Sequence, residues 1–187
     1  REAERLGQGE AFSAIACAGR SAAECHHQPG DTVLRRGQPL LADLGLKLDH
    51  VCADMTRCVS FGPPTPLWRE IYQVVLAANR AAIRAIRPGV PCKAIDAAAR
   101  DMIKQAGYGA YFGHSLGHGL GLEVHESPSF STECTTELAP GMVLTVEPGI
   151  YLPGRLGIRI EDVILVTKDG CEVLTGTQRE LPRCVRI

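Results

Sequence analysis

FGHSLGHGLGLEVHE, residues 112–126, is the most informative stretch of this 187-residue sequence. It holds three of the six histidines, His114, His118 and His125, and four glycines interrupt it. Histidine is the commonest metal ligand and carries protons near neutral pH. Glycine lets a backbone pass close to a bound ion or substrate. The stretch therefore predicts either a metal site or a glycine-rich loop whose histidines are satisfied within the protein.

Acidic residues elsewhere in the chain help to decide between these alternatives. Asp43 and Asp54 are 11 residues apart, apolar residues flank both, and the midpoint between Leu48 and Asp49 lies in a polar stretch typical of a turn. This pattern predicts a β-hairpin with the two aspartates opposite each other, where Cβ atoms lie roughly 4.5–5.5 Å apart. Two like charges at that distance repel unless a cation lies between them.

A second pair, Glu147 and Glu161, repeats this design. The two glutamates are 14 residues apart, and their midpoint is Gly154 in the turn-like LPGRLG. Period-2 alternation places Thr145 and Glu147 on one strand face, and Arg159 and Glu161 on one face. Each acid alone could be a solvated strand end. Four acids in two hairpins, beside a histidine-rich segment, favour a metal site.

The kind of metal site follows from the ligand types. One imidazole nitrogen and four carboxylates form a mostly hard ligand set, which suits Mn(II), Fe(II) or Co(II) better than a structural thiolate zinc site. The set is large enough for two ions about 3.5–4 Å apart that share bridging carboxylates. We therefore predict a dinuclear metallohydrolase site.

The ordered motifs HH, DLG, DMTR, HxxxHGxGxxxHE, VEPG and RIED resemble the catalytic domain of the pita-bread metallopeptidases, which include aminopeptidase P, prolidase and methionine aminopeptidase. The resemblance runs from about Phe12 to Val173. It implies an α+β pita-bread (creatinase/aminopeptidase-like) fold with pseudo-two-fold symmetry, and a single metallopeptidase catalytic domain over residues 1–187. Relatives on this branch usually begin with further helices and a separate N-terminal domain. We therefore expect a fold truncated at its N-terminus.

The resemblance also implies a role for each acidic residue and for one histidine. Asp43 would bind one metal ion, and Asp54 and Glu161 would bridge two ions. His118 and Glu147 would complete the coordination of the second ion. Two divalent ions per chain are expected, with Mn(II) preferred and Co(II), Fe(II) and Zn(II) as alternatives.

Further residues would take part in catalysis, again by resemblance. Glu147 would serve as general base and proton carrier as well as ligand. His26 and His125 would stabilise the tetrahedral oxyanion and the leaving nitrogen, and His114 would contact the proline side of the substrate. Arg159 would orient Glu161 and Asp43 through its delocalised charge.

Two residues distinguish between the subfamilies that the motifs resemble. His114 and Arg159 resemble the aminopeptidase P and prolidase side, whereas methionine aminopeptidases usually lack both. The expected activity is metal-dependent hydrolysis, by a metal-bridging hydroxide, of the peptide bond that precedes proline at the N-terminus of a peptide. The protein would then be a dinuclear metallo-exopeptidase, an Xaa-Pro aminopeptidase or dipeptidase. Two alternatives stay open: methionine aminopeptidase specificity, and a non-catalytic metal-binding or peptide-binding remnant of the fold.

Composition limits the partners and the location. A net charge of −1 gives no reason to expect binding to nucleic acid or to an anionic membrane. No apolar run approaches the roughly 20 residues of a membrane helix, and no signal peptide is visible, although the chain begins with Arg1. We expect a cytoplasmic protein whose partner is a peptide with proline at its second position. A homodimer is a further option.

Eight cysteines are many for a peptidase of this kind, and none forms a CxxC pair. We expect reduced, mostly buried thiols, because free cysteine packs as a small hydrophobe. The alternative is a redox-sensing thiol or a Cys/His nucleophile, and Cys25 beside His26 is its best candidate.

Between the two halves of the predicted site, the sequence predicts two helices. Apolar residues follow helical spacing over 71–86, where Pro88 and Gly89 end the run, and again over 95–106, with Gly107 as the expected C-terminal cap. The segment 62–66, GPPTP, reads as a loop that leads into the first helix. The order of elements is therefore strands, two helices, then strands, with the metals between the halves.

Overall fold

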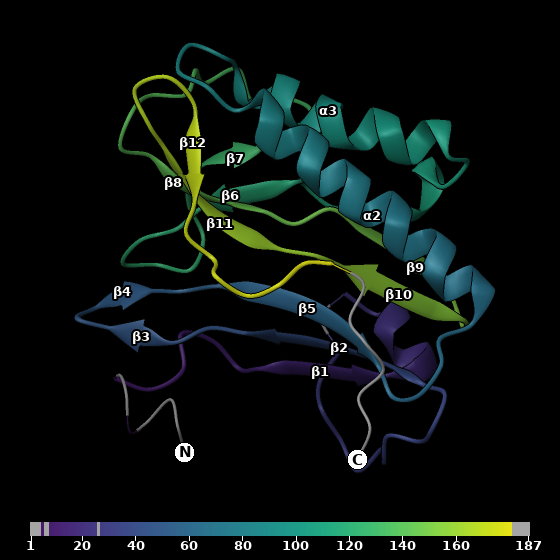
Figure 1. The fold of residues 1–187 in the computed structure, drawn as a ribbon. Coiled ribbons are helices and arrows are strands. Elements are labelled where there is room, and N and C mark those ends of the chain that lie inside the picture. The colour runs from purple at the N-terminus through teal and green to yellow at the C-terminus, as the bar shows by residue number, and fades with distance from the viewer. Residues whose placement is uncertain (1–4, 6–7, 26, 181–187) are drawn as a thin grey trace.

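The computed structural model describes residues 5, 8–25 and 27–180. The first half of the chain consists of strands and one short 3-10 helix (Figure 1). These elements are β1 (Ile15–Ala18), η1 (Gly19–Ala23), β2 (Pro39–Leu44), β3 (Lys47–Leu48), β4 (Val51–Cys52) and β5 (Met55–Ser60). β1, β2 and β5 form an antiparallel sheet in that order, and β3 and β4 extend the β2–β5 hairpin.

Two antiparallel helices follow, as the sequence predicts. α2 (Pro66–Ala85) begins where the Thr65 side chain accepts a hydrogen bond from the backbone N–H of Trp68, which satisfies one of the free N–H groups of the first turn. α3 (Cys92–Gln105) ends before Gly107, whose φ of +87° suits a residue without a Cβ. Both predicted helices and the loop before α2 are confirmed.

The second half contains one further 3-10 helix and seven strands. They are η2 (Gly109–Tyr111), β6 (Gly117–Gly119), β7 (Glu126–Phe130), β8 (Val143–Val146), β9 (Gly149–Leu152), β10 (Leu156–Arg159), β11 (Asp162–Val166) and β12 (Cys171–Val173). Five of these strands form a sheet in the order β12-β11-β8-β6-β7, and β9 pairs with β10. No described helix is long and apolar enough to cross a membrane.

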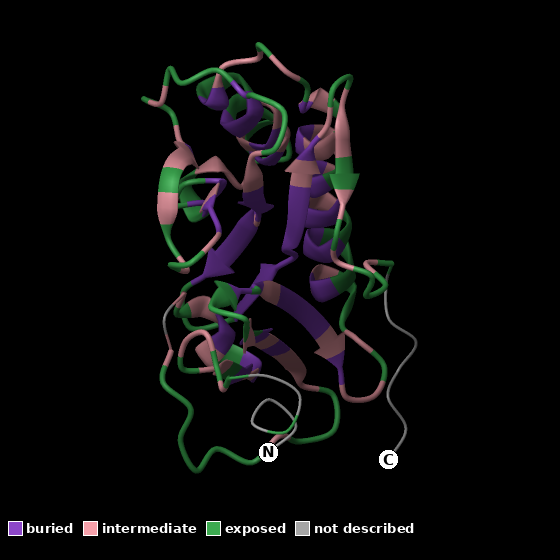
Figure 2. Cartoon of the chain, turned by 90° about the vertical axis from the view of Figure 1, so that its left-hand side faces the viewer, coloured by how far each residue is buried: buried purple, intermediate pink, exposed green. Residues whose placement is uncertain are grey.

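The hydrophobic core lies between the helices and the strands. Figure 1 shows α2 and α3 side by side over the sheet of the second half, with β1, β2 and β5 at the opposite end of the molecule. Side chains from both halves, including Leu41, Ile71, Ile95, Leu144 and Ile158, share one buried cluster. Figure 2 shows this burial concentrated in the strands and on the inner helix faces. Burying this apolar surface joins the two halves, which positions the residues between them.

The first acid hairpin differs from the prediction in its register. Asp43 pairs with Thr56, not with Asp54. The turn consists of Asp49 and His50, whose φ values of 48° and 67° are both positive, as in a two-residue turn of the type that suits the twist of a hairpin. This turn sets the pairing one step later than the predicted midpoint, so Asp54 falls diagonally to Asp43.

The second acid hairpin has the predicted register. Arg159 pairs with Gly149 in β9–β10, and Asp162 pairs with Val146 in β8–β11. The same register runs through both pairs and turns at Gly154, where φ is +68°. It therefore places Glu147 opposite Glu161, each in the short gap between two strands. The midpoint predicted at Gly154 is confirmed.

Candidate metal centre

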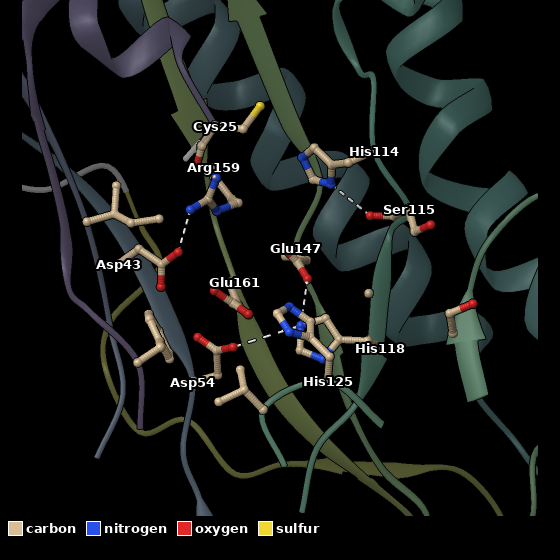
Figure 3. A pocket seen from close by; sticks show the side chains of 15 residues that line it. Cys25, Asp43, Asp54, His114, Ser115, His118, His125, Glu147, Arg159 and Glu161 are labelled. Carbon is tan, nitrogen blue, oxygen red and sulfur yellow. Dashed lines mark hydrogen bonds and ion pairs between the residues drawn. The ribbon is translucent and has the colours of Figure 1, made fainter. Parts of the chain in front are cut away.

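A cavity of about 470 Å³ lies between the two halves of the chain. Its lining includes every predicted site residue that the structure describes: Asp43, Asp54, His114, His118, His125, Glu147, Arg159 and Glu161. The remaining one, His26, lies outside the described residues. Figure 3 shows these side chains converging from strands and loops of both halves. Residues more than 100 positions apart are thereby brought to one site.

The strongest candidate for metal binding is a group of three residues at the centre of the cavity. Asp54, His118 and Glu161 each offer one ligand atom, and these atoms all lie within 4.8 Å of one another. Glu147 adjoins the group, because its Oε1 lies 3.2 Å from His118 Nε2. Figure 3 shows Asp54 and Glu147 both facing the His118 ring, and both contacts are to Nε2. The carboxylate of Asp43 lies outside this group of three, against Arg159.

Two buried oxygens test whether a cation fits here. Oδ1 of Asp43 and Oδ1 of Asp54 are both buried, and neither has a hydrogen-bond partner in the described structure. A buried polar atom without a partner costs about 1–3 kcal/mol, and more when it is charged. Carboxylate oxygens with one imidazole nitrogen are ligands that Mn(II), Fe(II) and Co(II) accept well. The residues present therefore fit a divalent cation.

The pKa values of three carboxyls are raised because these acidic groups are buried close together. Burial, followed by the charges of Asp43 and Glu147, raises the pKa of Asp54 to about 7. Burial also raises the pKa of Asp43, against the opposing effect of Arg159. Burial and the neighbouring acids raise the pKa of Glu161 well above its ordinary value. A cation among these groups would stabilise their ionised forms and so reverse the shifts.

Glu147 has the opposite shift. Burial acts to raise its pKa, but the hydrogen bond with His118 and the charge of Arg159 lower it overall. The pKa of His118 is correspondingly raised, because its contact with Glu147 outweighs the effect of burial. Thr145 joins the pair, since its hydroxyl lies 3.2 Å from Glu147 Oε1 and accepts a hydrogen bond from the His118 backbone N–H at 3.0 Å. Glu147 is thus held as an ionised carboxylate.

His118 owes its position to the glycines around it. A Cβ on Gly117 would lie 2.0 Å from the backbone oxygen of Thr145, so β6 can approach β8 this closely only with glycine there. The Nδ1 of His118 lies 3.0 Å from the backbone oxygen of Gly119. An N–H at Nδ1 can donate to that oxygen. In the metal-free protein Nε2–H donates to Glu147 Oε1, and loss of that proton would free the Nε2 lone pair to bind a cation beside Asp54 and Glu147.

Arg159 connects the two hairpins. Its Nη2 contacts Oδ2 of Asp43, and its Nε donates to Thr56 Oγ1 at 2.9 Å. The Thr56 hydroxyl in turn donates to Glu161 Oε2 at 2.6 Å. Arg159 therefore touches Asp43 directly and Glu161 through Thr56. Sequence analysis missed Thr56, although its place two residues after Asp54 put it near the predicted strand.

Tyr151 is a second residue that sequence analysis missed. Its hydroxyl accepts a hydrogen bond from Arg159 Nη1 at 2.9 Å and lies 2.9 Å from His114 Nε2. The other ring nitrogen of His114, Nδ1, lies 2.8 Å from the backbone oxygen of Ser115. Burial lowers the pKa of His114, which favours the neutral ring. Because the Ser115 oxygen can only accept, Nδ1 of this neutral ring donates and Nε2 accepts. Tyr151 resembles an ordinary core residue because its flanking residues, Ile150 and Leu152, are apolar.

The loop that carries His114 is held from outside the cavity by α3. Asp96 and Arg100 form a two-pronged ion pair, with N–O distances of 2.7 and 2.9 Å. Arg100 also donates to the backbone oxygens of Phe112 and His114, at 3.0 and 2.8 Å. Asp96 accepts from the backbone N–H of Leu116 at 3.2 Å. This pair fixes three backbone groups of the loop between α3 and β6.

Two further residues adjoin the cavity. The ring of His125 lies 4.3 Å from that of His118, centroid to centroid. Cys25 lines the wall near Arg159. The seven described cysteines are all free, as expected, and four of them are buried, whereas Cys184 lies outside the described residues.

Comparison with known proteins places this geometry in a family. An uncharacterized peptidase of Staphylococcus saprophyticus is 52% identical over 168 residues, which are 90% of this chain and 48% of that protein. A prolidase from Pyrococcus horikoshii OT3 is 44% identical, with a TM-score of 0.94 over 96% of this chain and 52% of that one. An X-Pro aminopeptidase from Thermotoga maritima MSB8 is 42% identical, with a TM-score of 0.93 over 95% and 51%.

The chain thus spans about half the length of the curated relatives that it matches. Its likeness to solved prolidases and X-Pro aminopeptidases confirms the pita-bread fold and the resemblance to that branch. The model of metallopeptidase family M24 matches residues 1–168, and the chain therefore belongs to metallopeptidase family M24.

Proposed function

We propose that this protein hydrolyses the peptide bond that precedes a proline in the second position of a peptide, with two divalent metal ions. The observation that carries the proposal is the gathering of four carboxylates and His118 in one cavity, with two buried oxygens left without partners. Similar solved structures are a prolidase and an X-Pro aminopeptidase, which supports the choice of substrate.

The metal ions would be held by Asp43, Asp54, His118, Glu147 and Glu161. This mostly oxygen set favours Mn(II), with Co(II), Fe(II) and Zn(II) as alternatives. When bound, such ions polarise a carbonyl and supply a strong nucleophile at neutral pH. Arg159 would keep Asp43 and, through Thr56, Glu161 in the geometry that ligation needs.

Glu147 would act as the proton carrier. Its pKa is lowered, so the carboxylate is ionised at neutral pH and can accept a proton. His118 and Thr145 hold that carboxylate in place from two sides. A proton taken up there can pass to the leaving nitrogen of the proline, which a general acid must protonate before it departs.

The histidines around the cavity would bind the substrate. His114 is neutral and fixed by Tyr151 and Ser115, so it presents a rigid aromatic wall toward the proline side. His125 lies against His118 and would donate to the developing oxyanion. His26, which lies outside the described residues, is proposed for the same task by resemblance alone.

The test uses the chain stripped of metal and then reloaded with Mn(II). Ala-Pro and Ala-Pro-Ala are offered as substrates, with Ala-Ala-Ala and Met-Ala-Ser as controls. We expect Mn(II)-dependent cleavage of the proline peptides, and the preferred length would distinguish a dipeptidase from an aminopeptidase. Cleavage of Met-Ala-Ser alone would replace the proposal with methionine aminopeptidase specificity. Metal uptake without any cleavage would indicate a non-catalytic binding protein.

Metal content provides a separate test of the ligands. His118→Ala should lower the bound Mn(II) measured by elemental analysis from two ions per chain toward one, because it removes the single nitrogen ligand. His50→Ala is the matched control, since His50 is exposed at the turn of the first hairpin. Equal metal content in both variants would remove His118 from the ligand set.

A further inference from the structure

Two cysteines far apart in the sequence meet outside the metal centre. Cys92 is the first residue of α3 and is fully buried, and Cys134 lies in the loop after β7. The two backbones run alongside each other: Cys92 N–H donates to the oxygen of Thr136 at 2.9 Å, and Lys93 N–H donates to the oxygen of Cys134 at 2.8 Å. Each thiol shifts the pKa of the other, so the two side chains lie close together. In Figure 1 the loop into α3 and the loop after β7 lie together at the upper end of the molecule.

The surroundings of Cys134 favour its thiolate. Donor groups of Thr136, Cys92 and Ser129 lie near its sulfur. Burial acts to raise the pKa of Cys134, but these donors together lower it. Hydrogen bonds to the charged form of a group stabilise that form. Cys134 is only half-buried, so a small reagent can reach it.

Cys92 has the opposite character. Burial raises the pKa of its thiol to about 12, so the thiol stays protonated at neutral pH. An accessible cysteine with a lowered pKa next to a buried thiol is the arrangement in which the first sulfur reacts and the second resolves the product. Neither residue lines the metal cavity.

We infer that Cys134 and Cys92 form an oxidation site that a hydroperoxide converts to a disulfide. The Cys134 thiolate attacks one peroxide oxygen, the O–O bond breaks, and the released hydroxide takes a proton from solvent, which gives Cys134 sulfenic acid and water. The Cys92 sulfur then attacks the Cys134 sulfur. The S–O bond breaks, the departing hydroxide takes the Cys92 proton as water, and the disulfide forms. Two thiols and one hydrogen peroxide give one disulfide and two waters.

This site differs from the candidate that the sequence favoured. Cys25 was singled out because it precedes His26, and the structure places Cys25 beside Arg159 in the cavity. The sequence did not predict the Cys92–Cys134 pair, because 42 positions separate the two cysteines. Only the packing of α3 against the loop after β7 brings them together.

The experiment treats the metal-free full chain with hydrogen peroxide at neutral pH and blocks the remaining thiols with N-ethylmaleimide. Trypsin then releases residues 85–93, with Cys92 as their only cysteine, and residues 105–155, with Cys134 as theirs. We expect mass spectrometry to find these two peptides joined, and to find them separate after reduction. The inference is overturned if both cysteines carry N-ethylmaleimide to the same extent as Cys171, or if Cys92 is joined to another cysteine.

Variants and a matched control assign the two roles. In Cys92→Ser, dimedone should trap a sulfenic acid on Cys134, whereas in Cys134→Ser the thiol of Cys92 should stay reduced. Cys171→Ser should form the Cys92–Cys134 bond as the unchanged chain does, because Cys171 is half-buried and its pKa is raised by burial. In the unchanged chain, N-ethylmaleimide should modify Cys134 faster than Cys171, since a lowered pKa increases the thiolate fraction and a raised pKa decreases it. Equal rates would contradict the assignment of Cys134 as the reactive thiol.

Discussion

The two acid hairpins share a shape but differ in how their carboxylates are satisfied. In the second, Glu161 accepts from Thr56, and Glu147 is paired with His118 and Thr145. In the first, Asp43 and Asp54 each keep one buried oxygen without a partner. The second hairpin is therefore largely completed by the protein itself. We propose that a cation satisfies the aspartates of the first, so metal should matter most to the stability of that half.

The largest effect is expected from the completed hairpin, at the residue proposed to carry the proton. Glu147→Gln keeps the size of the side chain but cannot accept a proton, so kcat/KM for the proline peptide that is cleaved should fall by about 10²–10⁴-fold. Glu172→Gln, an exposed change on β12, should leave the rate unchanged. A Glu147→Gln variant as active as this control would show that another group carries the proton.

The next largest effect is expected in how the stability of the metal-free protein depends on pH. The pKa of Asp54 is raised from its ordinary value of 3.8 to about 7 in the folded, metal-free protein. The folded state therefore binds more protons than the unfolded state between those values, and its stability falls as pH rises through that window. At about 1.4 kcal/mol per pKa unit, Asp54 contributes up to roughly 4 kcal/mol. Asp43 and Glu161 shift in the same direction, and Glu147 in the opposite one.

Thermal unfolding with EDTA should accordingly show a higher Tm at pH 5 than at pH 7. With Mn(II) the order should reverse, because acid protonates the ligands and releases the metal. Asp54→Asn should flatten much of the pH dependence of the metal-free protein. If metal-free and loaded protein respond alike to acid, the aspartates of the first hairpin do not bind the metal.

A smaller effect is expected where the two hairpins join. Thr56 is buried, and its hydroxyl links Arg159 to Glu161. Thr56→Val keeps the shape but leaves both partners without this bond, which should lower the free energy of unfolding by about 1–3 kcal/mol. Thr56→Ser retains the hydroxyl and should lose less. Urea denaturation would measure both, and equal losses would mean that packing of the methyl group, not the hydroxyl bridge, matters at this position.

The smallest effect is expected at the turn that sets the register of the first hairpin. His50 has a φ of 67°, a conformation that costs most residues about 1–2 kcal/mol and costs glycine little. His50→Gly should therefore stabilise the fold by up to about 1 kcal/mol without changing turnover. Its backbone N–H, which donates to Gln8 at 2.9 Å, is retained. A destabilised variant would show that the imidazole itself supports the turn.

Much of the site could be predicted from residue types and their spacing. The helical stripes predicted α2 and α3, because a 3.6-residue apolar period needs no knowledge of distant contacts. The midpoint at Gly154 predicted the second hairpin correctly, since a residue with positive φ marks the turn. The same reasoning predicted the wrong register for the first hairpin. Its turn consists of Asp49 and His50, which have positive φ values although neither is a glycine, so the sequence does not mark the turn. The register set by this turn pairs Asp43 with Thr56.

The sequence by itself determined the order of strands and helices, the family resemblance and the residues able to bind metal, because these depend on local pattern and on side-chain chemistry. The tertiary structure decided which groups complete the site. Thr56, Tyr151 and the Asp96–Arg100 pair hold the cavity through contacts between distant segments. Cys92 and Cys134 likewise meet only through packing. A hydrogen bond between such residues leaves no periodic signal in the chain, since it depends on how whole elements are placed in space.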